Sequence, residues 1–213
     1  MGMVDPVSFF EIQRVVEDWA IFRDSGQFDQ LLSLWHDDGR MMTTWAQVSA
    51  ADFVSRSREA FGNGAMVNHT LGGCHIDIVG NRAIAQTKMT ITQRGLIDGI
   101  VCDAICDGRF YDFFERRNGE WRIVLRQPIY ERDRLGPVEV GAVLVLDQKL
   151  LHQFPEGYRY LAYLQTKLGM VVKSDMPGLR GPEIETLYAR GKDWLEVENA
   201  TSVPTCYAKG DAA

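Results

Sequence analysis

The sequence contains no block of lysine or arginine residues and no long apolar run. Its 213 residues carry 29 acidic and 23 basic side chains, a formal net charge of −6. Nucleic-acid binding needs a basic face to meet the phosphates, so this composition argues against a nucleic-acid partner. No segment reaches the ~18 consecutive apolar residues of a membrane span, and the first residues lack the basic and apolar regions of a signal peptide. We therefore expect a cytoplasmic protein with no nucleic-acid and no membrane partner.

Cysteine is scarce, and its positions form no recognisable metal site. The four cysteines are Cys74, Cys102, Cys106 and Cys206. Cys102 and Cys106 are four residues apart in a strand-like run, where they share a face, and no second Cys or His pair completes a zinc set. We expect no metal and reduced thiols.

The sequence patterns of the common cofactor-binding folds are missing as well. Neither the Gly-x-Gly-x-x-Gly pattern of dinucleotide binding nor the Gly-x-Ser-x-Gly nucleophile elbow occurs. There is no Gly-rich phosphate loop either. These absences favour chemistry without a cofactor.

Three helices are expected in the first third of the chain. Ser8 and Glu11 have the spacing of a capping box, and apolar residues recur after them at helical spacing until about residues 24–26. A short second helix precedes a strand over residues 40–44. Ser49 is the expected cap of a third helix over residues 50–61.

The pattern changes to strands after residue 65. Long strands are expected near residues 66–79, 82–94, 99–115 and 120–133, with a hairpin turn at Asn118-Gly119. Three helices followed by long antiparallel strands indicate an α+β fold, with the helices packed on one face of a curved sheet. Such a sheet curls around a pocket.

The chain divides into three expected parts. Residues 1–137 form the α+β domain. Residues 138–198 form a helical C-terminal extension, with helices opening at Pro155 and Pro182, that caps the cavity or packs at a subunit interface. Residues 199–213 are small and polar, and we expect them to be disordered.

One stretch, residues 66–78, carries the main functional hypothesis. Ile76 and Ile78 alternate with His75 and Asp77, as in a strand with one wet face, and the preceding Gly72-Gly73 indicates a bulge or bend. We place His69 on the incoming part of this strand, facing a cavity, where it can act as a base. A histidine in such a position is more often a satisfied core residue, so this hypothesis needs a partner for His69.

The chain from about residue 9 to residue 133 resembles the SnoaL-like branch of the nuclear transport factor 2-like superfamily. The phrases that carry the resemblance are Phe22-Arg23-Asp24-Ser25-Gly26, Leu34-Trp35-His36-Asp37-Asp38, Asn68-His69 with Ile76-Asp77-Ile78, and Phe114-Glu115-Arg116-Arg117-Asn118-Gly119-Glu120-Trp121-Arg122. Members include hexachlorocyclohexane dehydrochlorinase, scytalone dehydratase, bile-acid dehydratases, polyketide cyclases and cofactor-free aryl formaldehyde lyases. The resemblance implies a cone-shaped α+β barrel, and homotrimers are common among its members.

The resemblance also implies an Asp–His dyad. The family aspartate lies just past the first helix, at Asp24, and the family histidine opens the strand after the third helix, at His69. A carboxylate fixes the tautomer and orientation of an imidazole and stabilises the imidazolium that forms when it takes a proton. Arg126 matches a family arginine that can hold an anionic leaving group or an oxyanion. The alternatives are a solvated carboxylate for Asp24 and a surface arginine for Arg126.

Two departures from the family pattern bear on the substrate. Trp19 replaces a family lysine or tyrosine, and Met41 replaces a pocket tryptophan of the dehydrochlorinase. A polar donor is thus exchanged for an indole with a single N–H, and the pocket gains apolar, polarisable surface. This argues against dehydrochlorination and favours a larger, flatter, aromatic substrate.

Further candidates for the pocket lining come from the strands, each with plain core packing as the alternative: Val67, Met89, Ile91, Phe110, Tyr111 and Tyr130. His36 and His75 are expected to face outward beside acidic neighbours, and His152 has no evident partner.

The function predicted from the sequence is that of a cofactor-independent lyase. His69 would take a proton from a hydrophobic, aromatic, hydroxylated substrate, with loss of water or of formaldehyde. An isomerase or cyclase would use the same proton chemistry, and a non-catalytic small-ligand-binding protein would need the cavity but not the dyad. The resemblance further implies a homo-oligomer, with a trimer as the expected state.

Overall fold

The computed structural model describes residues 5–196, so the expected disorder of residues 199–213 and the state of Cys206 lie outside the described residues. The described helices are α1 (Pro6–Asp24), α2 (Phe28–Ser33), α3 (Ala50–Gly62), α4 (Gln148–Leu151), α5 (Arg159–Lys167) and α6 (Pro182–Glu196). The described strands are β1 (Trp35–Met42), β2 (Gln47–Ser49), β3 (Met66–Val79), β4 (Arg82–Ile97), β5 (Ile100–Arg117) and β6 (Glu120–Pro137). None of the described helices is long and apolar enough to cross a membrane.

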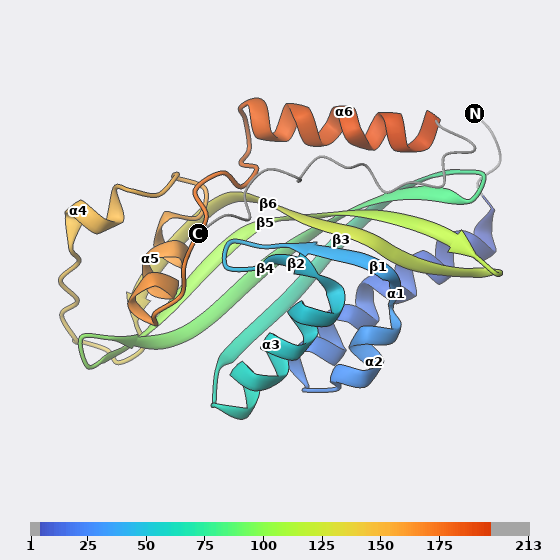
Figure 1. Ribbon diagram of the computed structural model, residues 1–213. Coiled ribbons are helices and arrows are strands. Elements are labelled where there is room, and N and C mark those ends of the chain that lie inside the picture. The colour runs from blue at the N-terminus through green and yellow to red at the C-terminus, as the bar shows by residue number, and fades with distance from the viewer. Residues whose placement is uncertain (1–4, 197–213) are drawn as a thin grey trace, which may run out of the picture.

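The strands form one curved sheet in the order β2-β1-β6-β5-β4-β3 (Figure 1). The long strands β3 to β6 pair as successive antiparallel hairpins, whereas β1 lies parallel to β6. The α+β class expected from the sequence is confirmed. The sheet is mixed and not closed, because β1 runs parallel to β6 after a crossover and because β2 and β3 remain the two edges of the sheet.

Helices cover both faces of the sheet (Figure 1). α1, α2 and α3 lie below the sheet and build the larger hydrophobic core on its inner, concave face. On the outer face, Ile184, Leu187 and Trp194 of α6 pack in a second core against β4, β5 and β6. The three N-terminal helices share one face of the sheet, as expected, and α6 of the C-terminal extension covers the other. Phe113 and Phe114 are neighbours on β5 and both are buried, so this part of the sheet is apolar on both sides and needs cover on both.

The first helix begins earlier than expected. Its N-cap is Asp5, whose side chain accepts hydrogen bonds from Val7 N and from the Ser8 hydroxyl, so Ser8 is not the cap. The helix ends at Asp24, as expected. Gly26 follows with φ +76°, and a Cβ there would lie 2.8 Å from the Phe61 ring, so both the backbone and the packing require glycine.

The hairpin turns fix the register of the long strands. Asn118 and Gly119 both have positive φ, 53° and 86°, which confirms the predicted turn of type I′ geometry. Asp98 and Gly99 form an equivalent turn, with φ 50° and 85°, so β4 continues three residues beyond its expected end. The pairing of β3 with β4 shifts register between Leu71 and Cys74, which confirms the irregularity predicted at Gly72-Gly73.

Candidate functional site

The structure brings Asp24 and His69 into direct contact. The Nδ1 atom of His69 lies 2.7 Å from Oδ1 of Asp24, and the backbone N–H of His69 donates to Oδ2 at 2.5 Å. Both carboxylate oxygens of Asp24 are thus engaged by the same residue. Only 7% of the His69 side chain and 16% of the Asp24 side chain are exposed.

The contact with Asp24 sets the tautomer of the imidazole. An ionised carboxylate only accepts hydrogen bonds, so the proton of a neutral His69 resides on Nδ1 and the lone pair is on Nε2. No described residue forms a hydrogen bond with Nε2. Burial lowers the pKa of His69 below its ordinary value of 6.5, and the hydrogen bond and negative charge of Asp24 oppose that shift. The resting imidazole is therefore a neutral base with a free lone pair.

Two elements far apart in the sequence position this pair. Asp24 is the last residue of α1, where the partial negative charge of the helix end disfavours a carboxylate. The two hydrogen bonds from His69, near the start of β3, compensate for this placement. The ring of Trp19 meets the imidazole edge to face at 5.2 Å, and the ring of Phe110 lies 6.0 Å away on another side, so His69 has little freedom to turn.

His69 faces a small cavity between the inner face of the sheet, the helices α1 and α3, and the C-terminal extension. Its volume is about 70 Å³. The side chains that line it are mainly aromatic or aliphatic, with a few polar groups: Arg23, Thr43, His69, Gln93, Tyr130 and Gln165. This volume holds about two water molecules, and it is about half of an apolar cavity that takes up benzene. An aromatic ring therefore fits only if lining side chains move.

The C-terminal extension closes one side of this cavity. Leu161 and Gln165 of α5 and the following Met170 are part of its lining. Gln165 is held in place because it accepts a hydrogen bond from the Thr44 hydroxyl at 2.7 Å and donates one to Gln93 at 3.0 Å. Displacing α5 would break these buried hydrogen bonds.

Arg126 lies in the wall behind the cavity and is not among the lining residues. Its Nε and Nη2 atoms both donate to Asp112 at 2.7 Å, and neither side chain is exposed. Its guanidinium lies over the rings of Trp19 and Phe110 at 4.2 and 4.1 Å. The prediction that Arg126 meets a leaving group does not match this position, because Arg126 does not line the cavity and two of its nitrogens already donate to Asp112. Its Nη1 atom has no hydrogen-bond partner among the described residues.

Most of the predicted lining residues do reach the cavity. These are Trp19, Met41, Val67, Ile91, Phe110 and Tyr130. Met89 is buried in the inner core without reaching the cavity. The placement of Tyr111 in the pocket was wrong. Successive residues of a strand point to opposite faces, so with Phe110 inward Tyr111 points outward, where its ring lies 5.5 Å from that of Tyr188 on α6.

The other histidines lie away from this cavity. His75 is exposed, as expected, whereas His36 is buried and its Nε2 lies 2.8 Å from the Glu115 carbonyl oxygen. The expectation that His36 faces outward was wrong, because its ring is buried against the backbone of β5 at Glu115. Within residues 5–196, no group of three or more His, Cys, Asp or Glu side chains could hold a metal ion.

Sequence reasoning missed Arg23, the one cationic group in the cavity lining. Arg23 follows Val16 and Trp19 at helical spacing and shares their buried face of α1. A charged residue within an otherwise apolar helical stripe is the signal that could have identified it.

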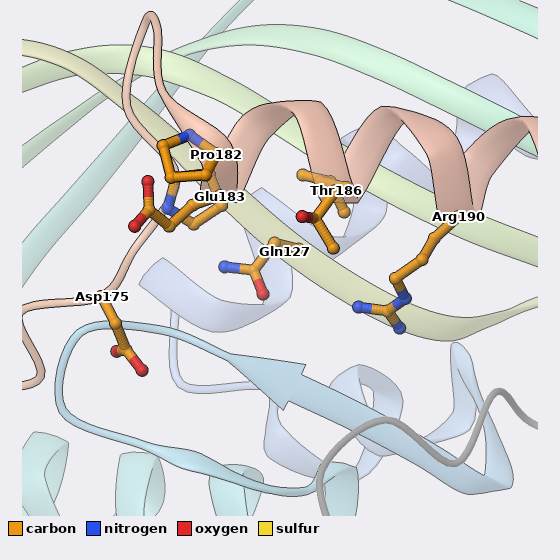
Figure 2. Close-up of a pocket in the computed structure, with 8 residues that line it drawn as sticks. Gln127, Asp175, Pro182, Glu183, Thr186 and Arg190 are labelled. Atoms are coloured by element: carbon orange, nitrogen blue, oxygen red, sulfur yellow. The ribbon is translucent and has the colours of Figure 1, made fainter.

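A second, larger hollow lies on the outer side of the sheet, beside α6, with a volume of about 280 Å³ (Figure 2). Asp175, Glu183 and Arg190 are its charged lining residues. Figure 2 shows Arg190 and Thr186 extending from α6 on the side where Gln127 of β6 lies. This hollow contains no histidine, so the proton-transfer chemistry predicted from the sequence belongs to the inner cavity.

A known protein family covers the part of the chain that contains the Asp24–His69 pair. The family model described as SnoaL-like domain matches residues 10–127, which include both Asp24 and His69. The chain belongs to this family. The SnoaL-like domain is part of the nuclear transport factor 2-like superfamily, so the resemblance read from the sequence is confirmed.

Curated relatives of this SnoaL-like protein come from fungi. It is 36% identical over 202 residues to an uncharacterized protein of Emericella nidulans, with 87% of this chain and 85% of the relative covered. It is 35% identical over 199 residues to pea pathogenicity protein 2 of Fusarium vanettenii, with 88% and 85% covered. Alignments that cover this much of the chain continue well beyond Gln127, so these relatives share a large part of the C-terminal extension.

Solved structures share the fold at low sequence identity. A putative scytalone dehydratase from Novosphingobium aromaticivorans is 17% identical with a TM-score of 0.52, covering 68% of this chain and 96% of that one. A type 2 hexachlorocyclohexane dehydrochlorinase is 16% identical with a TM-score of 0.53, covering 67% and 95%. These structures align over nearly their whole length but leave about a third of this SnoaL-like protein uncovered.

Proposed function

We propose that this protein is a cofactor-independent lyase that acts by proton abstraction. Nε2 of His69 takes a proton from a hydroxyl group or an acidic carbon of a hydrophobic, hydroxylated aromatic substrate. Asp24 holds the imidazole in the required tautomer and stabilises the imidazolium that results. When the proton comes from carbon, the carbanion expels hydroxide, which takes the proton back from the imidazolium and leaves as water. When it comes from a hydroxyl group, the alkoxide collapses by retro-aldol cleavage to formaldehyde and a carbanion, which the imidazolium protonates.

The observation that carries this proposal is the free lone pair of His69, which faces a partly enclosed cavity. Nδ1 is engaged by Asp24 at 2.7 Å, whereas Nε2 has no described partner. A merely structural histidine would have both ring nitrogens satisfied when it is buried this deeply. Two structural neighbours are named as a putative dehydratase and a dehydrochlorinase; both names describe eliminations and support the same class of reaction.

The aromatic surfaces of the cavity support a ring-shaped substrate. Trp19, Trp45 and Phe110 line it, and Met41 and Met170 supply flexible side chains that can repack around a ligand. Some of these side chains must move outward when an aromatic substrate binds, because the cavity volume of about 70 Å³ is smaller than the volume of an aromatic ring.

Turnover of a panel of aromatic alcohols without added cofactor tests the proposal. New absorbance from a conjugated product indicates loss of water, and a colorimetric formaldehyde assay detects the retro-aldol outcome. The variant His69→Ala should lose about 10²–10⁴-fold in kcat, the usual contribution of a general base. The matched control is His75→Ala on the same strand, where the histidine is exposed, and it should keep full activity.

Three results would contradict the proposal. Full turnover by His69→Ala would remove the imidazole from the mechanism. A product of the same composition as its substrate would indicate an isomerase or cyclase with the same proton step. Binding without turnover, equally strong in His69→Ala, would indicate a small-ligand carrier.

Cytoplasmic location and assembly as a homotrimer remain part of the proposal, and size-exclusion chromatography with light scattering tests the latter.

A further inference from the structure

Arg23 is a buried cation in the wall of the cavity. It lies four residues after Trp19 on the inward face of α1, and only 6% of it is exposed. A guanidinium stays protonated in proteins, so its charge is present in the resting molecule.

No described residue forms a hydrogen bond or an ion pair with the side chain of Arg23. Its sequence neighbour Asp24 is the nearest source of negative charge, but both oxygens of that carboxylate are used by His69. A buried charge without partners destabilises a fold unless something else satisfies it.

The other polar groups of the cavity lining are mostly satisfied. The Thr43 and Tyr130 hydroxyls pair at 3.2 Å, and Gln93 and Gln165 pair at 3.0 Å. Arg23, the Nε2 atom of His69 and the indole N–H of Trp19 are left without partners among the described residues. The lining groups that lack a hydrogen-bond partner among the described residues therefore include a cation, a base and a neutral buried donor.

We propose that Arg23 binds a carboxylate group of the substrate, so that the substrate is a hydrophobic carboxylic acid. This inference rests on the proposed function and names the substrate class for the same site. A guanidinium presents a planar fork of donors that matches a carboxylate. A permanent anion fits better than a transient oxyanion, because the cation is buried and unpaired before any reaction begins. Arg126 is less suited to this part, because its Nε and Nη2 atoms already donate to Asp112 and it does not line the cavity, although its Nη1 atom has no hydrogen-bond partner among the described residues.

Binding of small carboxylates to the full-length protein tests the inference without any need for turnover. The probes are acetate, propionate and benzoate, each compared with its uncharged amide at pH 7 by calorimetry and by the shift of the thermal unfolding midpoint. We expect at least one carboxylate to bind about tenfold or more tightly than its amide, as hydrogen bonds to a charged group are worth at least that factor. The series of sizes also measures how far the cavity opens.

The variant Arg23→Met should lose this preference for the carboxylate and bind acid and amide alike. The matched control is Arg14→Met on the same helix, where the arginine side chain is 82% exposed, and it should bind as the wild type does. Failure of all three carboxylates to bind the wild-type protein, or equal binding by Arg23→Met, would overturn the inference. His69→Ala should bind the carboxylate normally, so a failure of the catalytic proposal is seen separately.

Steady-state kinetics provide the second readout once a substrate is identified. Loss of a ground-state contact raises KM and leaves kcat nearly unchanged, whereas loss of a contact made only in the transition state lowers kcat. We expect Arg23→Lys to raise KM. A fall in kcat at constant KM would overturn the carboxylate assignment in favour of oxyanion stabilisation.

Discussion

On the outer face of the sheet α6 packs a tryptophan and several aliphatic side chains onto the strands, whereas the inner face keeps a cavity with charged and polar groups in its wall. On the outer face, the side chains of Trp194 and Arg109 have hydrogen-bond partners. The Trp194 indole donates to the Phe114 carbonyl at 3.2 Å, and Arg109 donates to Glu131, Gln86 and Tyr188. The inner face leaves Arg23, His69 Nε2 and the Trp19 N–H unsatisfied.

The difference between the two faces distinguishes residues that stabilise the fold from residues that bind a ligand. Buried polar groups in folded proteins are hydrogen-bonded with few exceptions, and each exception needs an explanation. On the inner face, three such groups, the Arg23 side chain, Nε2 of His69 and the indole N–H of Trp19, lie at one cavity, and ligand binding accounts for these three together. The indole N–H groups of Trp35 and Trp121 and the Nη1 atom of Arg126 are also buried without a hydrogen-bond partner among the described residues, but they do not line this cavity and a ligand there does not explain them.

The largest expected effect on stability comes from the paired arginine of the inner wall. Arg126→Met leaves Asp112 buried without its counter-charge, and we expect the free energy of unfolding to fall by about 3–5 kcal/mol, measured by urea denaturation. The second change Asp112→Leu should recover most of this loss, because it removes the orphaned carboxylate.

Substitution of the unpaired Arg23 should have the opposite effect on stability. Arg23→Met removes a buried charge that has no partner to lose, so stability without ligand should stay the same or rise. Equal destabilisation by Arg126→Met and Arg23→Met would contradict the distinction between a structural and a ligand-binding arginine.

On the outer face, Gly191→Ala tests how tightly α6 packs. A Cβ at this position would lie 1.9 Å from the Tyr111 hydroxyl oxygen and 2.8 Å from its ring, so the helix has to move away. We expect a loss of about 1–3 kcal/mol of stability, typical of overpacking, with turnover per folded molecule unchanged. Tyr111→Phe in the same chain should restore part of the loss. A fall in kcat proportional to the loss of stability would show that the two faces are not independent.

The sequence allowed much of this architecture to be predicted, because the strands and turns carry local signals. The pair Asn118-Gly119 specified its hairpin, and alternation along β3 specified which residues face inward. The resemblance supplied Asp24 and His69, which are forty-five positions apart and have no local signal of contact. The neutralisation of Arg126 by Asp112 could not be foreseen, because it depends on the register between β5 and β6. The outer position of Tyr111 could have been foreseen from strand alternation alone.

The smallest expected effect is a pH dependence that arises from His69 on the inner face. Burial lowers the native pKa of His69 from its ordinary value of 6.5, so the acid limb of kcat/KM should lie at lower pH than for a free imidazole. In the unfolded chain His69 takes up its proton near pH 6.5, before the native state does. The unfolded state therefore binds more protons below that pH, and the stability contributed by His69 is present above it and falls as the pH falls.

Asp24→Asn sharpens this pH test. The carboxylate of Asp24 raises the pKa of His69 against the effect of burial, so its removal should move the acid limb of kcat/KM to still lower pH, along with a reduced rate. Gly191→Ala on the outer face should leave the limb where it is in the wild type. A limb that moves to higher pH in Asp24→Asn would mean that a group other than His69 titrates in the reaction, since no loss of negative charge beside an imidazole can make it easier to protonate.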